Sequence, residues 1–187
     1  MNILQSGLPA AAALKLSGCS VGALESTSAG LISACLQSCP GASNYWSGSL
    51  NIYSAKAAKA FLPRDIQLQL GKPKDNYASA SKYVQSKQVF TKVLGKFFRD
   101  KMKVDWFIAE SGAAEASIGV TKLSGAFTVL TLLGPNDIVI TKTIYGKPGG
   151  ASRVENMWLF TQAALAMLEK EVTRYNGTKN TITPSKL

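Results

Sequence analysis

Short apolar runs typical of strands alternate with segments of helical periodicity along most of this chain, and this alternation constrains the fold more than any other feature. The last two strand patterns flank a hairpin turn composition, Gly134 to Asp137. Strands that alternate with helices build α/β domains, so the sequence predicts a single three-layer α/β domain, a mixed β-sheet covered by helices. The expected helices span 8–16, 28–37, 54–62, 76–101 and 151–175, and the expected strands span 21–24, 50–53, 104–109, 126–133 and 138–145.

Length and composition fit one domain. With 187 residues, 46% of them apolar, the chain can bury a core without disulfides or a structural metal. We expect the domain to occupy residues 1–175 and a flexible polar tail to occupy 176–187. No run of 18 or more apolar residues occurs, so we expect no membrane segment.

The chain has no histidine, which limits its chemistry. A Ser-His-Asp triad, a Cys-His pair and a histidine-ligated metal are all excluded. Cys19, Cys35 and Cys39 lack the further ligands that a zinc site needs, so buried thiols are expected and no metal or cofactor. Any acid–base step would use lysine, tyrosine, a carboxylate or a hydroxyl group.

The net charge of +10 is concentrated between residues 82 and 103. There Lys92, Lys96, Arg99 and Lys103 fall on one helix face. Such a face is either solvated or a nucleic-acid surface. Because no groove-reading motif accompanies the charge, a nucleic-acid partner is not expected.

Three junctions combine glycine with hydroxyl side chains where a strand pattern gives way to an expected helix. They lie at 24–30, 109–114 and 145–153. Helix N-termini offer free N–H groups and partial positive charge, so these junctions suggest a small anionic ligand. The alternative is that glycines and capping residues serve only the turns. Tyr83 and Lys87 have a dehydrogenase-like spacing, but no G-x-G-x-x-G accompanies them, and the sequence gives the pair no role.

The chain ends in Ser185-Lys186-Leu187, the tripeptide read by the peroxisomal import receptor. A polar stretch precedes it, which suits a signal that a receptor must reach. The sequence therefore predicts a peroxisomal matrix protein with that receptor as a partner. The alternative is coincidence.

Several segments resemble the CinA C-terminal domain family. Residues 25–32 (ESTSAGLI) are similar to the family's E-S-C-T-G-G-L-I, and residues 40–43 (PGAS) to its P-G-S-S turn. Residues 48–54 (GSLNIYS) resemble G-G-V-V-T-Y-S, and 111–114 resemble the start of T-G-I-A-G-P. The resemblance covers residues 5 to 172. It implies a three-layer α/β domain, usually oligomeric, that hydrolyses the carboxamide of nicotinamide mononucleotide (NMN) to the acid and ammonia without a cofactor.

The resemblance also implies catalytic residues, since the family uses a serine with a lysine. By position Ser43 is the nucleophile, Lys59 its activator and Tyr53 the group that orients or relays the proton. Lys59 matches if one residue is inserted, and Lys56 is a further candidate. A desolvated lysine can activate a hydroxyl group without histidine.

Four further residues would bind substrate in this alignment. Ser111 and Gly112 would hold the oxyanion or the substrate, while Ser26 and Arg153 would line the mononucleotide site, with Arg153 clamping a phosphate or carboxylate. Segments 27–29 and 113–118 depart from the family pattern. Two functions therefore stay open, a CinA-like amidohydrolase and a catalytically inactive or repurposed CinA-fold protein of the peroxisomal matrix.

Overall fold

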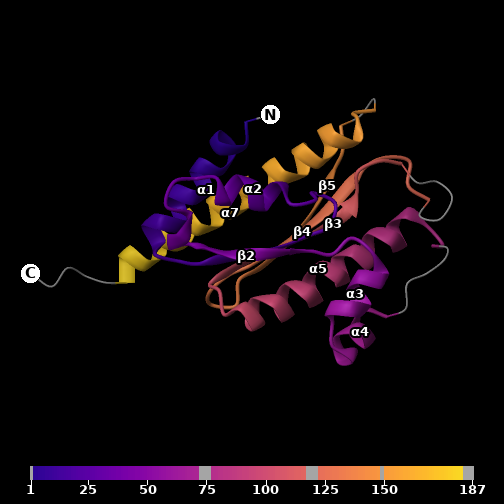
Figure 1. Ribbon diagram of the computed structural model, residues 1–187, viewed down its shortest axis with the longest axis horizontal. Helices are drawn as coiled ribbons and strands as arrows, with labels where there is room; N and C mark the ends of the chain where they lie inside the picture. The colour runs from indigo at the N-terminus through magenta and orange to yellow at the C-terminus, as the bar shows by residue number, and fades with distance from the viewer. Residues whose placement is uncertain (1, 72–76, 117–121, 148–149, 183–187) are drawn as a thin grey trace, which may run out of the picture.

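In a computed structural model, which describes residues 2–71, 77–116, 122–147 and 150–182, five strands form one sheet in the order β2-β1-β3-β4-β5 (Figure 1). β1, β2 and β3 are parallel, whereas β4 and β5 are antiparallel to their neighbours. The carboxyl ends of β1, β2 and β3 therefore meet at one edge of the sheet. The strands are β1 (Val21–Glu25), β2 (Trp46–Asn51), β3 (Trp106–Ala113), β4 (Phe127–Leu133) and β5 (Val139–Tyr145).

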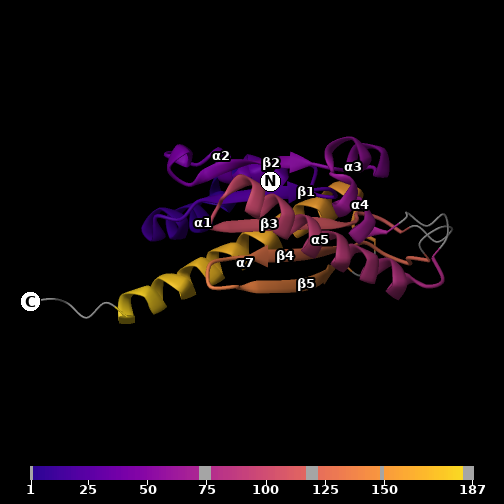
Figure 2. The same ribbon diagram turned by 90° about the horizontal axis from the view of Figure 1, so that it is seen from below.

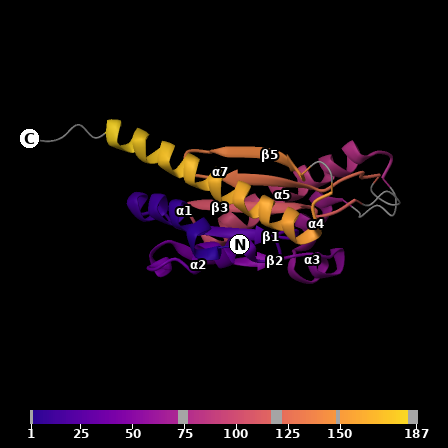
Figure 3. The same cartoon turned by 90° about the horizontal axis from the view of Figure 1, so that it is seen from above.

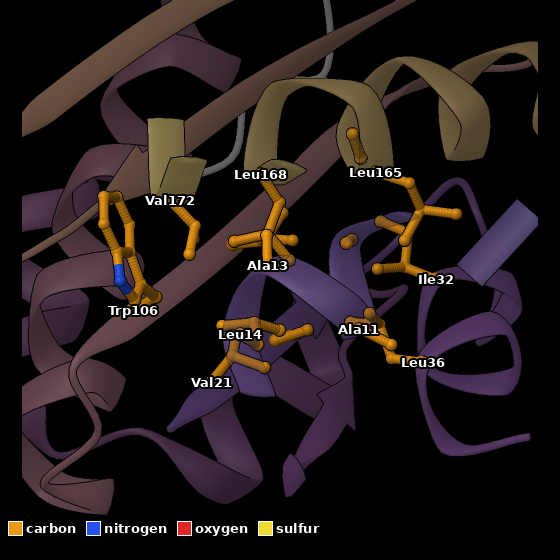
Figure 4. Packing of buried hydrophobic residues seen from close by; sticks show 14 of the residues in the cluster. Ala11, Ala13, Leu14, Val21, Ile32, Leu36, Trp106, Leu165, Leu168 and Val172 are labelled. Carbon is orange, nitrogen blue, oxygen red and sulfur yellow. The ribbon is translucent and has the colours of Figure 1, made fainter. Parts of the chain in front are cut away.

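One face of the sheet is covered by α1 (Ile3–Ser17), α2 (Leu31–Gln37) and α7 (Arg153–Ile182), which Figure 3 shows in front of the strands. Alternate residues of the strands point to this face, Trp106 of β3 among them. They pack against apolar side chains of all three helices, including Leu14, Ile32 and Leu168 (Figure 4). Full burial of such a side chain contributes about 1.5–3 kcal/mol.

The other face carries α5 (Ala80–Met102), with α3 (Ala55–Phe61) and α4 (Arg64–Leu70) beside it (Figure 2). Phe107 of β3 points to this side and packs with Phe98 of α5 at a ring-centroid distance of 6.5 Å. The sheet thus lies between two helical layers, which confirms the predicted α/β class and three-layer architecture.

Several helix boundaries differ from the sequence expectation, since α1 begins at Ile3 rather than 8 and α5 begins at Ala80 rather than 76. α2 begins at Leu31 rather than 28, because Ala29 and Gly30 adopt left-handed backbone conformations, with φ of 55° and 94°. The final helix was expected to end at residue 175 and a flexible tail to follow. α7 instead continues to Ile182, and Asn176 is buried, donating from Nδ2 to the carbonyl oxygen of Ala13 at 3.2 Å.

The prediction of a strand–loop–helix junction at residues 109–114 is wrong. Residues 110–113 continue β3 and pair in register with β4, so that Glu110 faces Leu130 and Gly112 faces Thr128. The continuous apolar run of residues 106–109 ends at Ala109, so the sequence indicates a loop from Glu110 onwards. Hydrogen bonds to a buried carboxylate compensate for placing this glutamate in a strand.

Candidate functional site

A cavity of about 360 Å³ lies at the edge where the parallel strands end. Its walls come from the loop after β1, the end of β2, the end of β3 and the beginnings of α5 and α7. The lining residues are Ser26, Thr27, Tyr53, Tyr83, Lys87, Gly112, Ala113, Ala114, Glu115, Ala116 and Arg153. This edge is where α/β proteins commonly bind small ligands.

The loop after β1 is held by two buried carboxylates. Glu25 accepts hydrogen bonds from the backbone N–H groups of Gly30, Ile32 and Ser33 at 2.9–3.0 Å, which satisfies donors at the start of α2. Glu110 accepts from the backbone N–H groups of Ser26 at 3.1 Å and Ser28 at 2.9 Å. Glu110 thus fixes the backbone around Ser26, and Glu25 fixes the start of α2.

Ser28 joins the two carboxylates. Its Oγ lies 2.8 Å from Oε2 of Glu25 and 2.9 Å from Oε2 of Glu110. The Glu110 carboxylate also accepts a short hydrogen bond from the hydroxyl group of Thr128 on β4. The loop is therefore anchored through β3 to the antiparallel half of the sheet.

Thr27 links the loop directly to β3. The backbone N–H of Gly112 donates to Oγ1 of Thr27 at 2.7 Å. A Cβ atom at residue 112 would lie 2.1 Å from the carbonyl oxygen of Phe127, so only glycine fits there. Glycine at this position keeps β3 and β4 paired right up to the cavity wall.

Arg153, the first residue of α7, reaches across the cavity mouth. Its Nη1 lies 2.7 Å from Oε1 of Glu115, and its Nη2 donates to the hydroxyl group of Tyr53 at 3.2 Å. These contacts, the one with Tyr53 first, raise the pKa of the guanidinium. The arginine thus carries a fixed positive charge that already has a carboxylate partner.

Lys87 and Tyr83 enter from α5. The Nζ of Lys87 lies 5.2 Å from the ring centroid of Tyr83 and 5.5 Å from that of Phe90. Burial lowers the pKa of Lys87, although the charge of Glu110 acts in the opposite direction. Burial also raises the pKa of Tyr83 to about 12, so this phenol keeps its proton.

Four of the seven predicted site residues line this one cavity. They are Ser26, Tyr53, Gly112 and Arg153. Ser111 lies directly beside it, in β3, but its hydroxyl group is fully buried and has no hydrogen-bond partner among the described residues.

Ser43 and Lys59 do not line it. Ser43 is exposed in the short 3-10 helix before β2, whereas Tyr53 follows the other end of that strand. Six extended residues, about 20 Å, separate these two positions. Lys59 and Lys56 are exposed on α3 and do not contribute to the cavity wall.

Sequence reasoning missed Glu110, Thr27 and the role of α5. Lys87 lies in the basic stretch 82–103, and its dehydrogenase-like spacing from Tyr83 gave it no role. The signal that could have separated it is spacing, since Lys87 lies one helical turn before Thr91 on the stripe that packs against the sheet. Lys92 and Lys96 are exposed.

A second and larger cavity of about 690 Å³ adjoins the first and shares Glu115 and Ala116 with it. It lies between α5 and the segments around Ser124 and Lys147. Asn156 of α7 contributes to its wall, and in the part of the chain that the structure describes Oδ1 of this side chain has no hydrogen-bond partner. The two cavities together form an elongated site large enough for a nucleotide-sized ligand.

Three expectations concern metals, cysteines and membranes. Among the described residues no group of three histidine, cysteine or acidic side chains gathers as a metal site would require. Cys19, Cys35 and Cys39 are free, buried thiols, as predicted. None of the helices in the described ranges combines the length and apolarity needed to cross a membrane. The C-terminal tripeptide, Ser185 to Leu187, lies outside the described residues.

Fold and cavity together define an α/β protein with a cavity at the carboxyl edge of a three-stranded parallel unit. More particularly, the chain belongs to the CinA family, because residues 8–172 match the CinA C-terminal domain. No curated protein matches the chain.

Solved structures support the fold. The competence damage-inducible protein A (ComA) of Klebsiella pneumoniae MGH 78578 is 16% identical with a TM-score of 0.76, over 94% of this chain and 99% of that one. A competence-damaged protein (CinA) superfamily protein of Klebsiella pneumoniae 700603 is 14% identical with a TM-score of 0.74, over 93% and 99%. The competence/damage inducible protein CihA of Agrobacterium tumefaciens is 19% identical with a TM-score of 0.65, over 89% and 93%.

Proposed function

We propose that this protein is an amidohydrolase that releases ammonia from the carboxamide of NMN or a related nucleotide. The observation that carries the proposal is the cavity itself, in which Ser26, Tyr53, Gly112 and Arg153 converge from four separate segments. Membership of the CinA family supplies the reaction class, because NMN deamidation is the activity that the sequence resemblance implies.

The cavity offers groups suited to each part of such a substrate. Arg153 provides a planar cation for a phosphate or carboxylate group. Ser26 provides the hydroxyl group best placed for attack, because its backbone is fixed by Glu110 and its own Oγ has no hydrogen-bond partner among the described residues. The other hydroxyl groups are engaged, Thr27 by Gly112 and Tyr53 by Arg153.

The resemblance favours Ser43 as the nucleophile, and this assignment remains an alternative. In one chain Ser43 lies beyond the opposite end of β2 from Tyr53, so it could join this cavity only from a second copy of the protein. The Ser43 alternative therefore requires a homo-oligomer, whereas attack by Ser26 does not.

Ammonia release from NMN, measured with purified protein, tests the proposal. Ser26→Ala is expected to lower kcat by about 100-fold or more, since removing a nucleophile abolishes the covalent route. Ser43→Ala is the matched variant and should keep activity within about twofold. If Ser43→Ala loses activity and Ser26→Ala keeps it, Ser43 is the nucleophile instead. Wild-type protein that releases no ammonia from any nucleotide carboxamide would refute the amidohydrolase function.

A repurposed binding protein is the second candidate, and one contact favours it. Arg153 is already paired with Glu115, which lies in the segment that departs from the family pattern. A thermal shift with NMN in the absence of ammonia release would identify this function.

We further propose import into the peroxisomal matrix through Ser185-Lys186-Leu187 and its receptor. A fluorescent fusion that retains the natural C-terminus should colocalise with a peroxisomal marker. Deletion of the last three residues should leave it diffuse, and equal peroxisomal signal from both fusions would refute the proposal.

A further inference from the structure

The positive charge of this protein is concentrated in one layer of the fold. Residues 55–103, which contain α3, α4 and α5, hold twelve lysines and arginines but only three aspartates and no glutamate. The rest of the chain holds nine basic and eight acidic residues, so its charge is almost balanced. Nearly all of the net charge of +10 therefore belongs to the segment that contains the helices on one side of the sheet (Figure 2).

Most basic side chains of this layer are exposed and have no acidic partner. The exposed ones are Lys56, Lys59, Arg64, Lys82, Lys92, Lys96, Lys101 and Lys103. Among the described residues, only Lys96 of this set forms an ion pair, with Asp100 of the same helix at 3.2 Å. Unpaired like charges repel one another and disfavour the compact state, so the fold itself gains nothing from their concentration here.

Apolar side chains are exposed among these cations. Phe61 of α3 and Leu68 of α4 are 67% and 71% exposed. Val89 is also exposed, and it lies on the same stripe of α5 as Lys82 and Lys92, which are seven residues before it and three after it. Lysines interspersed with exposed apolar groups are typical of protein surfaces that lie on anionic membranes.

We propose that α3, α4 and α5 form a docking surface for an anionic lipid bilayer. Ten of the twelve basic residues in 55–103 are lysines, which act as point charges towards a field of lipid headgroups, whereas recognition of single phosphates favours the planar fork of arginine. Insertion of Phe61 and Leu68 at the level of the headgroups removes apolar area from water. A nucleic-acid backbone would meet the same charge but offers no apolar phase for Leu68. The proposal does not depend on the amidohydrolase function.

Sedimentation of the purified protein with lipid vesicles tests the proposal. At an ionic strength of about 0.15 M, we expect binding to vesicles of phosphatidylcholine mixed with phosphatidylserine and none to vesicles of phosphatidylcholine alone. Each lysine near such a surface contributes about fivefold to the affinity, so Lys59→Gln/Lys92→Gln should weaken binding by about tenfold or more. The control Lys142→Gln/Lys170→Gln removes the same charge from exposed positions of β5 and α7 and should stay within about twofold of wild type.

A second pair of variants tests insertion of the apolar groups. Leu68→Ser should weaken vesicle binding by about fivefold, whereas Leu16→Ser, at a position of α1 that is 81% exposed on the other side of the sheet, should bind as wild type. No binding to the phosphatidylserine vesicles, or equal losses in the two double-lysine variants, would overturn the proposal. Tighter binding to a short DNA duplex than to these vesicles, with Leu68→Ser unchanged towards both, would overturn it in favour of a nucleic-acid surface.

Discussion

At the scale of single residues, the contacts of one serine show how the loop after β1 is held. Ser28 has one hydroxyl hydrogen and lies within 2.9 Å of two carboxylates, so it can satisfy only one of them at a time. The remaining stabilisation of Glu25 and Glu110 comes chiefly from backbone N–H groups. Each glutamate is therefore a structural anchor of the loop that carries Ser26 and Thr27.

Thr27→Val tests this anchoring. The substitution preserves shape but leaves the partly buried N–H of Gly112 without the Thr27 hydroxyl group as acceptor, so we expect the free energy of unfolding to fall by about 0.5–1.5 kcal/mol. Denaturant unfolding measures the change. Thr173→Val, at an exposed position of α7, is the control and should stay within about 0.5 kcal/mol of wild type. Equal losses in the two variants would contradict the role of the hydrogen bond.

At the scale of single elements, the pattern of apolar residues and the composition of the turns predicted the strands and most of the helices. β1 follows from a short apolar run, and the β4–β5 hairpin from its turn, where Asn136 and Asp137 take positive φ values of 55° and 58°. α4 was not expected, because seven residues after a proline carry too little periodicity.

The site was predicted less completely than the fold, because the spacing of motifs along the sequence does not show how deeply a side chain is buried. Ser26 and Arg153 were found because they belong to local motifs. Lys87 and Glu110 were not, because their roles arise only when α5 and β3 pack together. Ser43 and Tyr53 were assigned to one site by their resemblance to family motifs, although the length of β2 keeps them apart.

Helix packing makes a second prediction. A Cβ atom at Gly7 of α1 would lie 2.0 Å from the carbonyl oxygen of Cys35 in α2, so Gly7→Ala should force the helices apart. We expect a loss of roughly 1–3 kcal/mol in thermal or denaturant unfolding. Gly177→Ala in α7 meets no atom within 4 Å and should instead stabilise the protein by about 0.5–1 kcal/mol. Stabilisation by both substitutions would contradict the close approach of α1 and α2.

At the scale of the whole molecule, alkaline pH should lower the free energy of unfolding, because a thiol buried in the core is hard to ionise. Burial raises the pKa of the Cys35 thiol from 9.0 to about 11, so the folded state holds its proton more tightly than the unfolded state. This contribution is complete below pH 9 and is lost as the pH rises towards 11, and it corresponds to roughly 2–3 kcal/mol.

Comparison of wild type with Cys35→Ala isolates the thiol, because the buried tyrosines affect both proteins equally. The difference in unfolding free energy should be constant from pH 6 to 8 and should move in favour of the variant between pH 9 and 11. A constant difference across the whole range would show that Cys35 ionises alike in both states.

The contact between Arg153 and Glu115 has a consequence for selectivity. Glu115 is tethered, so it competes for the guanidinium as an intramolecular anion with a high effective concentration. A dianionic phosphate, which forms two charge-assisted hydrogen bonds, can displace it. Under the proposed function, an anionic substrate would therefore have to displace Glu115 before it could bind to Arg153.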